Sequence, residues 1–148
     1  MTTQTKIPWE QIPPNVRSKL IWGIWFATWI GLLAGLLVNR VFYEYVVVFS
    51  ALHAFVFWVL FGFSVKPFPM QLRVAYVAWV TAGTYVPALT FFLYITMIGL
   101  ATNLFLGYCP MARILYLLPW NREQSFSWRL VKQVFSTPPV PGKFRLTP

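Results

Sequence analysis

The longest apolar stretch of the chain, residues 74–109, constrains the fold more than any other feature. It contains no Lys, Arg, Asp, Glu or His, and Gly83 and Pro87 interrupt it. As a single helix of about 36 residues it would be roughly 54 Å long, against about 30 Å for the hydrocarbon core of a membrane. The stretch therefore predicts either one overlong helix or two short membrane spans that turn near Pro87.

The composition indicates that lipid surrounds most of this chain. Hydrophobic residues make up 58% of it and aromatic residues 20%, with twelve Lys and Arg against three acidic residues. A soluble protein carries charge on about a quarter of its residues. The basic residues lie at the ends of apolar stretches and in the tail, so we expect anionic lipids as their partners and no nucleic acid. The first apolar stretch is long enough to span, which predicts a retained anchor and not a signal peptide.

Four apolar segments predict the fold class, an all-α integral membrane protein with a four-transmembrane-helix bundle. Residues 1–19 are expected to form an extended cytoplasmic arm, with Trp9 near the membrane surface and Asn15 capping the first helix. Residues 20–109 are expected to hold the transmembrane domain. Its predicted spans are about 20–38, 45–63, 70–86 and 87–108.

The distribution of positive charge favours two crossings of the long apolar stretch. Five basic residues lie in the N-terminal arm and residues 64–73, six lie in the tail, and Arg40 alone lies in the loop 39–44. Two crossings place eleven of the twelve on one side, and short cytoplasmic loops are the ones rich in Lys and Arg. We therefore expect both termini in the cytoplasm of a multi-pass protein of the bacterial inner membrane. Arg73, near a span end, is expected to snorkel to the head groups.

The region after the last span is amphipathic. Residues 110–135 predict short interfacial helices, with Arg113 beside the apolar face of the first and Ser125 or Ser127 capping the second. Residues 136–148 are proline-rich and predict an extended tail that becomes ordered against a partner.

Small residues recur every four positions along the first span, at Gly23, Ala27, Gly31 and Gly35. Residues at i and i+4 share a helix face, and small side chains on one face allow a second helix to approach closely. We expect a helix-packing face whose partner is either another helix of this chain or another subunit. Asn103, deep in the last span, is expected to help hold the helices together through its amide.

His53 is the only histidine and falls near the middle of the second span. An ionisable residue at that depth is a functional hypothesis by default. One interpretation is a ligand to haem or bacteriochlorophyll, with the small residues Ser50 and Ala54 leaving room for the macrocycle. The other is a neutral imidazole that hydrogen-bonds to a polar residue of another helix, for which the candidates are Asn103, Thr96 and Thr81.

Cys109 is the only cysteine and lies at the interface that ends the long apolar stretch. A helix end and Arg113 could lower the pKa of its thiol and make it reactive, or the thiol could be structural. The sequence contains no metal-spaced His or Cys pairs, no glycine-rich phosphate loop and no carboxylate within a span. We therefore expect no enzyme activity and no metal site.

The last two spans and their exit, QLRVAYVAWV through TNLFLGYCPMARILYLL, resemble a small bacterial inner-membrane family of unknown function. Members form a helical hairpin that closes in a Gly-aromatic-Cys-Pro segment, and some are fused to a rhodanese sulfurtransferase and dimerise. The resemblance rests on Gly107, Tyr108, Cys109, Pro110, Ile114 and Leu115. It implies two crossings of the long stretch. The second cysteine that often follows in the family is absent here, where Pro119 and Trp120 stand.

These features predict a non-catalytic accessory or assembly subunit of a larger inner-membrane complex, respiratory or photosynthetic, with other membrane subunits, or a second copy of this chain, as its partners. One alternative is a tetrapyrrole-binding subunit that uses His53, and a further one is a membrane thiol or sulfur carrier that uses Cys109. Apart from such a pigment or haem, we expect no cofactor, and we expect bound lipids.

Overall fold

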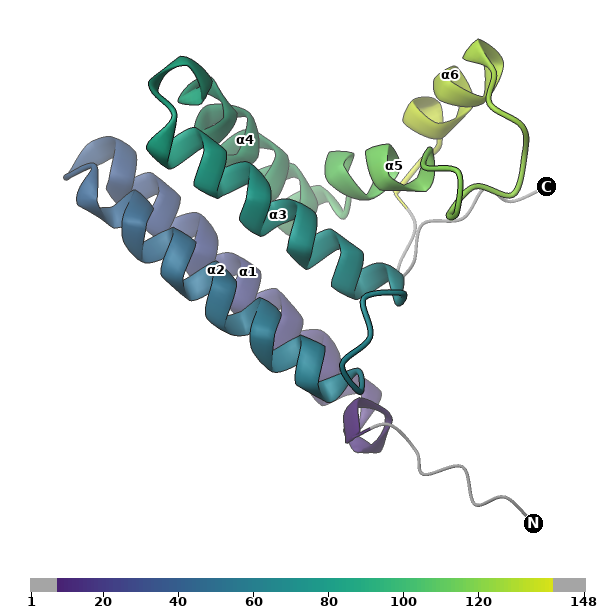
Figure 1. The fold of residues 1–148 in the computed structure, drawn as a ribbon, viewed down its shortest axis with the longest axis horizontal. Coiled ribbons are helices and arrows are strands. Elements are labelled where there is room, and N and C mark those ends of the chain that lie inside the picture. Colours follow the sequence, from purple (N-terminus) through teal and green to yellow (C-terminus); the bar gives the residue numbers. More distant parts are fainter. Residues whose placement is uncertain (1–7, 140–148) are drawn as a thin grey trace.

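The computed structural model describes residues 8–139, and every regular element in that range is a helix (Figure 1). The all-helical part of the predicted fold is confirmed. The four long helices are α1 (Pro14–Leu37), α2 (Val41–Leu60), α3 (Phe68–Tyr85) and α4 (Phe91–Leu106). The short ones are η1 (Pro8–Gln11), η2 (Pro87–Leu89), α5 (Pro110–Tyr116) and α6 (Trp128–Ser136).

The long helices pack around a shared core. Helix α1 contacts α2 and α4, and α3 contacts the same two helices. Their buried faces meet in one apolar cluster that includes Trp25, Leu32, Tyr43, Val46, Tyr76, Val80, Leu93 and Leu100. The α1–α2 turn and the α3–α4 turn lie at one end of this arrangement, and the α2–α3 loop and α5 lie at the other (Figure 1).

Within the described residues, three helical segments are long and apolar enough to cross a membrane, namely Pro14–Leu37, Val41–Leu60 and Pro87–Leu106. Helix α3 has 18 residues, among them Gln71 and Arg73, and its first turns are therefore less apolar than those of the other long helices. The sequence-based expectation of spans in α1, α2 and α4 thus agrees with the helices observed.

The first helix begins earlier than predicted, and the N-terminal arm is not extended throughout. Pro13 has the extended ψ of 140° and Pro14 is the first helical residue, where the missing N–H of proline costs nothing. Asn15 therefore lies inside the helix and does not cap it. Trp9 in η1 is buried, with its ring centroid 4.8 Å from that of Phe57, so it packs on α2 and is not part of an extended arm. Its place near the membrane surface stays a prediction.

Glycine, cysteine and proline set the sharp change of direction after α4. Gly107 has the left-handed φ of 69°, and the N–H groups of Gly107 and Tyr108 donate to the carbonyls of Asn103 and Thr102. This is the usual hydrogen-bonding pattern of a glycine that terminates a helix. Pro110 then opens α5, which packs against α3 and α4.

Helix α6 is held against α5 by an apolar cluster and by hydrogen bonds from Arg113. Leu130 and Val134 are buried against Tyr116, and Arg113 of α5 donates to the backbone carbonyls of Val134 and Pro138. Ser127 caps the helix by accepting from the N–H of Leu130, as one of the two predicted caps. Of the predicted extended tail, residues 140–148 lie outside the described residues.

Candidate functional site

Arg73 is the most unusual side chain of the fold, because it is a cation buried among aromatic rings. It is 2% exposed, and its guanidinium carbon lies 3.5 Å from the centroid of the Phe57 ring and 5.8 Å from that of Trp25. One nitrogen, Nη1, donates to the Pro69 carbonyl at 2.8 Å. Nε and Nη2 have no hydrogen-bond partner in the described part of the chain. The prediction that Arg73 snorkels to the head groups is wrong, since rings from α1 and α2 cover it.

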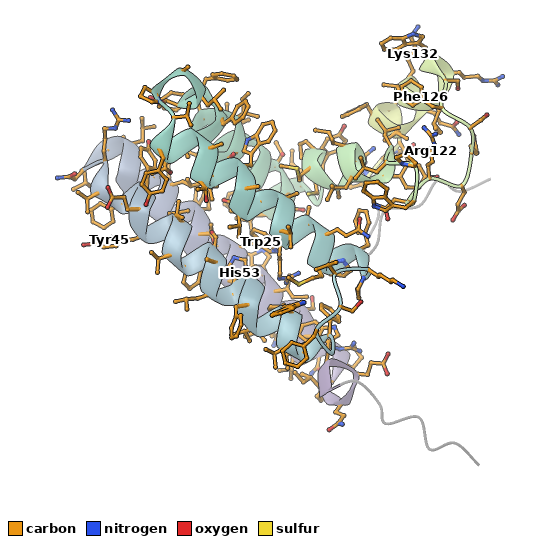
Figure 2. All side chains as sticks on the ribbon, viewed as in Figure 1. Trp25, Tyr45, His53, Arg122, Phe126 and Lys132 are labelled. Atoms are coloured by element: carbon orange, nitrogen blue, oxygen red, sulfur yellow. The ribbon has the colours of Figure 1, made fainter. Side chains whose placement is uncertain are left out.

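His53 lies in the same layer of the structure, on α2, and its side chain points toward Trp25 of α1 (Figure 2). The two rings meet edge to face at 5.4 Å, and Phe49 packs at 5.6 Å. Neither imidazole nitrogen has a hydrogen-bond partner within residues 8–139. The predicted hydrogen bond to Asn103, Thr96 or Thr81 is therefore not formed.

The surroundings of His53 do not favour a tetrapyrrole. Ser50 and Ala54, the small residues expected to leave room for a macrocycle, are 0% and 8% exposed because neighbouring helices cover them. The rings of Trp25 and Phe49 take up the space around the imidazole. The two unpartnered nitrogens are the one feature that fits a ligand at this position.

Trp25 and Tyr76 complete this buried cluster, and sequence reasoning missed both. Their rings meet edge to face at 4.9 Å, and the Tyr76 hydroxyl is buried without a partner among the described residues. A signal was present in α3, where Arg73, Tyr76, Val80 and Gly83 follow the helical spacing of three and four residues and are all buried. The spacing marks a buried face that carries a charge.

A cavity of about 520 Å³, here called the arginine cavity, opens where the beginnings of α1 and α3 face the end of α4 and the start of α5. Both Arg17 and Arg73 line it, together with Ser18, Trp25, Asn103 and Cys109. A smaller apolar cavity of about 80 Å³ shares Trp25, Leu72, Asn103 and Cys109 with it. Asn103, expected to link helices, thus lines both cavities.

Another helix of the chain packs closely on only one half of the row of small residues on α1. A Cβ atom added to Gly31 would come within 2.6 Å of Val46, and one added to Gly35 within 2.4 Å of the Tyr43 ring, so α2 packs closely on this half. A Cβ atom at Gly23 would meet no described atom within 4 Å, and Ala27 is exposed. The partner of the predicted packing face is therefore α2 for Gly31 and Gly35, while Gly23 and Ala27 stay open.

Cys109 is the N-cap of α5, where its Sγ accepts from the N–H of Ala112 at 3.4 Å. Burial raises the pKa of this thiol, and the N–H groups of Ala112 and Met111 and the charge of Arg113 oppose that effect only in part. A thiol that holds its proton is a poor nucleophile. The environment favours the structural interpretation of Cys109 over a sulfur carrier.

Comparisons of the chain with protein-family models, with curated proteins and with solved structures find no match. The resemblance of α3, α4 and α5 to the helical-hairpin family therefore stays a prediction. No group of three or more His, Cys, Asp or Glu side chains that could hold a metal ion occurs among residues 8–139. The features that distinguish the fold are the buried cluster around Arg73, the arginine cavity and the open half of the small-residue row.

Proposed function

We propose that this chain is a non-catalytic accessory or assembly subunit of a bacterial inner-membrane complex, embedded through α1–α4 with both termini in the cytoplasm. The distribution of side chains supports a lipid environment. Large apolar residues of the long helices face outward, as at Leu37, Ile98 and Leu106, which are 76%, 64% and 67% exposed. Polar groups lie inside instead, among them Thr28, Ser50, His53 and Arg73.

A crossing by α3 is part of this proposal, and its length and position support it. Its 18 residues span about 27 Å, close to the thickness of the hydrocarbon core. The helix lies beside α2 and α4, and its turn into α4 lies at the same end as the turn between α1 and α2 (Figure 1). Arg73, which makes α3 less apolar, is covered by Phe57 and so is not presented to lipid.

The open half of the small-residue row is the observation that carries the accessory-subunit proposal. Lipid acyl chains are as apolar as the surfaces of the helices, so the hydrophobic effect does not drive helices together in a membrane. They associate instead through close packing, which small residues allow. Gly31 and Gly35 make such a contact with α2, whereas Gly23 and Ala27 continue the same face without a partner. Beside them in the sequence, the rings of Trp22 and Phe26 are stacked with their centroids 4.9 Å apart and add aromatic surface. A helix of another subunit fits this surface.

The proposal predicts that Gly23→Leu combined with Ala27→Leu removes the partner and leaves the fold intact, because both positions are exposed. Gentle detergent extraction followed by native mass analysis should show the unaltered chain with a partner and the double variant without one. Ala51→Leu and Ala78→Leu, which place the same side chain at exposed positions of α2 and α3, are the matched controls and should keep the partner.

Two results would contradict the proposal. A stable lone monomer of the unaltered chain after gentle extraction would remove the need for any partner. A double variant that still carries its partner would place the contact elsewhere on the surface, away from Gly23 and Ala27.

A further inference from the structure

The arginine cavity brings together two cations and no anion. Arg17 on α1 and Arg73 on α3 both line it, and no acidic side chain is among the described residues that do so. The three acidic residues of the chain are Glu10, Glu44 and Glu123, and all three are exposed. Arginine keeps its charge at any pH relevant to a cell. The cavity is therefore positively charged, and nothing in the described chain neutralises it.

Some N–H donors of the two arginines also lack a hydrogen-bond acceptor within residues 8–139. Arg73 is 98% buried and uses one nitrogen on the Pro69 carbonyl, while its Nε and Nη2 lack a partner within the described chain. The Nε of Arg17 is likewise buried without one. Buried donors of a charged group are costly to leave unpaired. Two such groups on the wall of one cavity indicate a ligand that accepts several hydrogen bonds and carries negative charge.

Phosphate is the anion that this arrangement suits best. Guanidinium groups bind phosphate oxygens through paired N–H donors. Helices α1 and α3 both begin at this cavity, with Pro14 and Phe68 among its lining residues, and the positive ends of their helix dipoles add to the attraction. The half-buried Arg17 lies nearer the outside and the buried Arg73 lies deeper.

The neighbouring apolar cavity identifies the kind of molecule that would carry the phosphate. It shares Trp25, Leu72, Asn103 and Cys109 with the arginine cavity, and most of its other lining residues are apolar, such as Ile95 and Leu100. We propose that the two cavities form one site for an anionic phospholipid, with its phosphate at Arg17 and Arg73 and the start of an acyl chain between α3, α4 and α5. This site rests on the membrane embedding in the proposed function and is independent of the helix contact at Gly23.

The test measures how tightly a short-chain anionic phospholipid, dioctanoyl phosphatidylglycerol, binds to the full chain purified in detergent, by native mass spectrometry with titration. Dioctanoyl phosphatidylcholine is the neutral comparison and should bind at least about tenfold more weakly. Arg17→Gln and Arg73→Gln should each weaken phosphatidylglycerol binding by about tenfold or more. Lys19→Gln removes the same charge from an exposed position of α1 that does not line the cavity, and should change binding by less than about twofold.

A second variant keeps the test decisive if Arg73→Gln fails to fold without its contact to Phe57. Ser18→Trp places a large side chain at an exposed position on the cavity wall and leaves both arginines in place, so it should abolish lipid binding by occupying the space.

Four outcomes would overturn the assignment. Phosphatidylcholine carries the same phosphate beside a compensating ammonium group, so equal binding of the two lipids would rule out a site for an anionic phospholipid. A loss of binding in Lys19→Gln as large as in Arg17→Gln would reduce the effect to surface charge. Displacement of the lipid by inorganic phosphate would show that the cavity takes a soluble anion. Failure of lipid binding in a chain that still resists extraction from membranes would refute this inference and leave the proposed function standing.

Discussion

Arg73 and Arg113 are both 2% exposed, but their surroundings give them different roles. Arg113 donates to the carbonyls of Val134 and Pro138 and stacks on the Tyr108 ring at 3.9 Å, so it ties α5 to α6 and the segment after it. Arg73 has one backbone acceptor and stacks on Phe57, with two nitrogens left unpartnered among the described residues. Arg113 is a structural residue of the fold, and Arg73 is the residue we assign to a ligand.

The thiol of Cys109 predicts a specific alkaline loss of stability. Burial raises its pKa above the ordinary value of 9.0, so between that value and the raised one the unfolded chain releases the proton while the folded chain keeps it. The free energy of unfolding should therefore be unaffected by this group below about pH 8 and should fall above it, by at most about 1.4 kcal/mol per pH unit.

Cys109→Ser provides the control, because serine can cap α5 in the same way without titrating. The difference in unfolding free energy between the two proteins, measured in detergent across this alkaline range, isolates the thiol from the other groups that titrate there. A difference that stays constant with pH, or that grows in favour of the cysteine protein, would be inconsistent with a buried thiol.

Single residues are where the sequence was least informative. It indicated that Arg73 lies near a helix end, which is the usual reason to expect snorkelling. It could not indicate that Phe57 and Trp25, from two other helices, would cover the guanidinium, because such contacts depend on tertiary packing. The same holds for His53. Its position near the middle of a predicted span was evident from the sequence, but its contact with Trp25, which belongs to another helix, was not.

At the scale of elements, the two halves of α1 differ in what they tolerate. Gly35→Ala would place a Cβ atom within 2.4 Å of Tyr43, a ring that is 5% exposed and has little space to move into. Overpacking of this kind costs typically about 1–3 kcal/mol. We expect a loss of that size in the free energy of unfolding, measured by denaturation in mixed detergent micelles.

Gly23→Ala is the matched control on the same helix face. Its added methyl group meets no described atom within 4 Å, so it should leave stability unchanged or raise it slightly through higher helix propensity. Equal stability of the two variants would mean that α2 does not pack on α1 as closely as these contacts require.

Some helix ends were predicted correctly from capping and proline residues, and others were not. Ser127 was identified as a possible cap from its position before an amphipathic stretch, and Pro87 marked the turn between α3 and α4. The start of α1 was placed too late, because Pro13 and Pro14 were taken to delay a helix that Pro14 in fact begins. Packing of Trp9 onto Phe57 and Phe61 has no local signal in the sequence.

In the whole molecule, the distribution of positive charge and the arrangement of the helices both support the topology that we propose. Within residues 8–139, the basic residues other than Arg40 belong to the start of α1, the α2–α3 loop, the start of α3, α5 and the segment after α5. The start of α1, the α2–α3 loop and α5 lie at the end of the helices opposite the α1–α2 and α3–α4 turns (Figure 1). The sequence predicted the all-helical class and the apolar helices from composition and periodicity. It could not predict the cavities, because these form only where several helices from distant parts of the sequence meet.

Site-directed labelling with a membrane-impermeant thiol reagent tests the central claim, four crossings with both termini in the cytoplasm, most directly. In a Cys109→Ser background, single cysteines would be placed at the exposed positions Asn39, Ala88 and Gln124. Asn39→Cys and Ala88→Cys should react in intact cells, and Gln124→Cys should react only after lysis. Labelling of Gln124→Cys in intact cells together with protection of Ala88→Cys would mean that α3 does not cross the membrane and that the chain has three crossings.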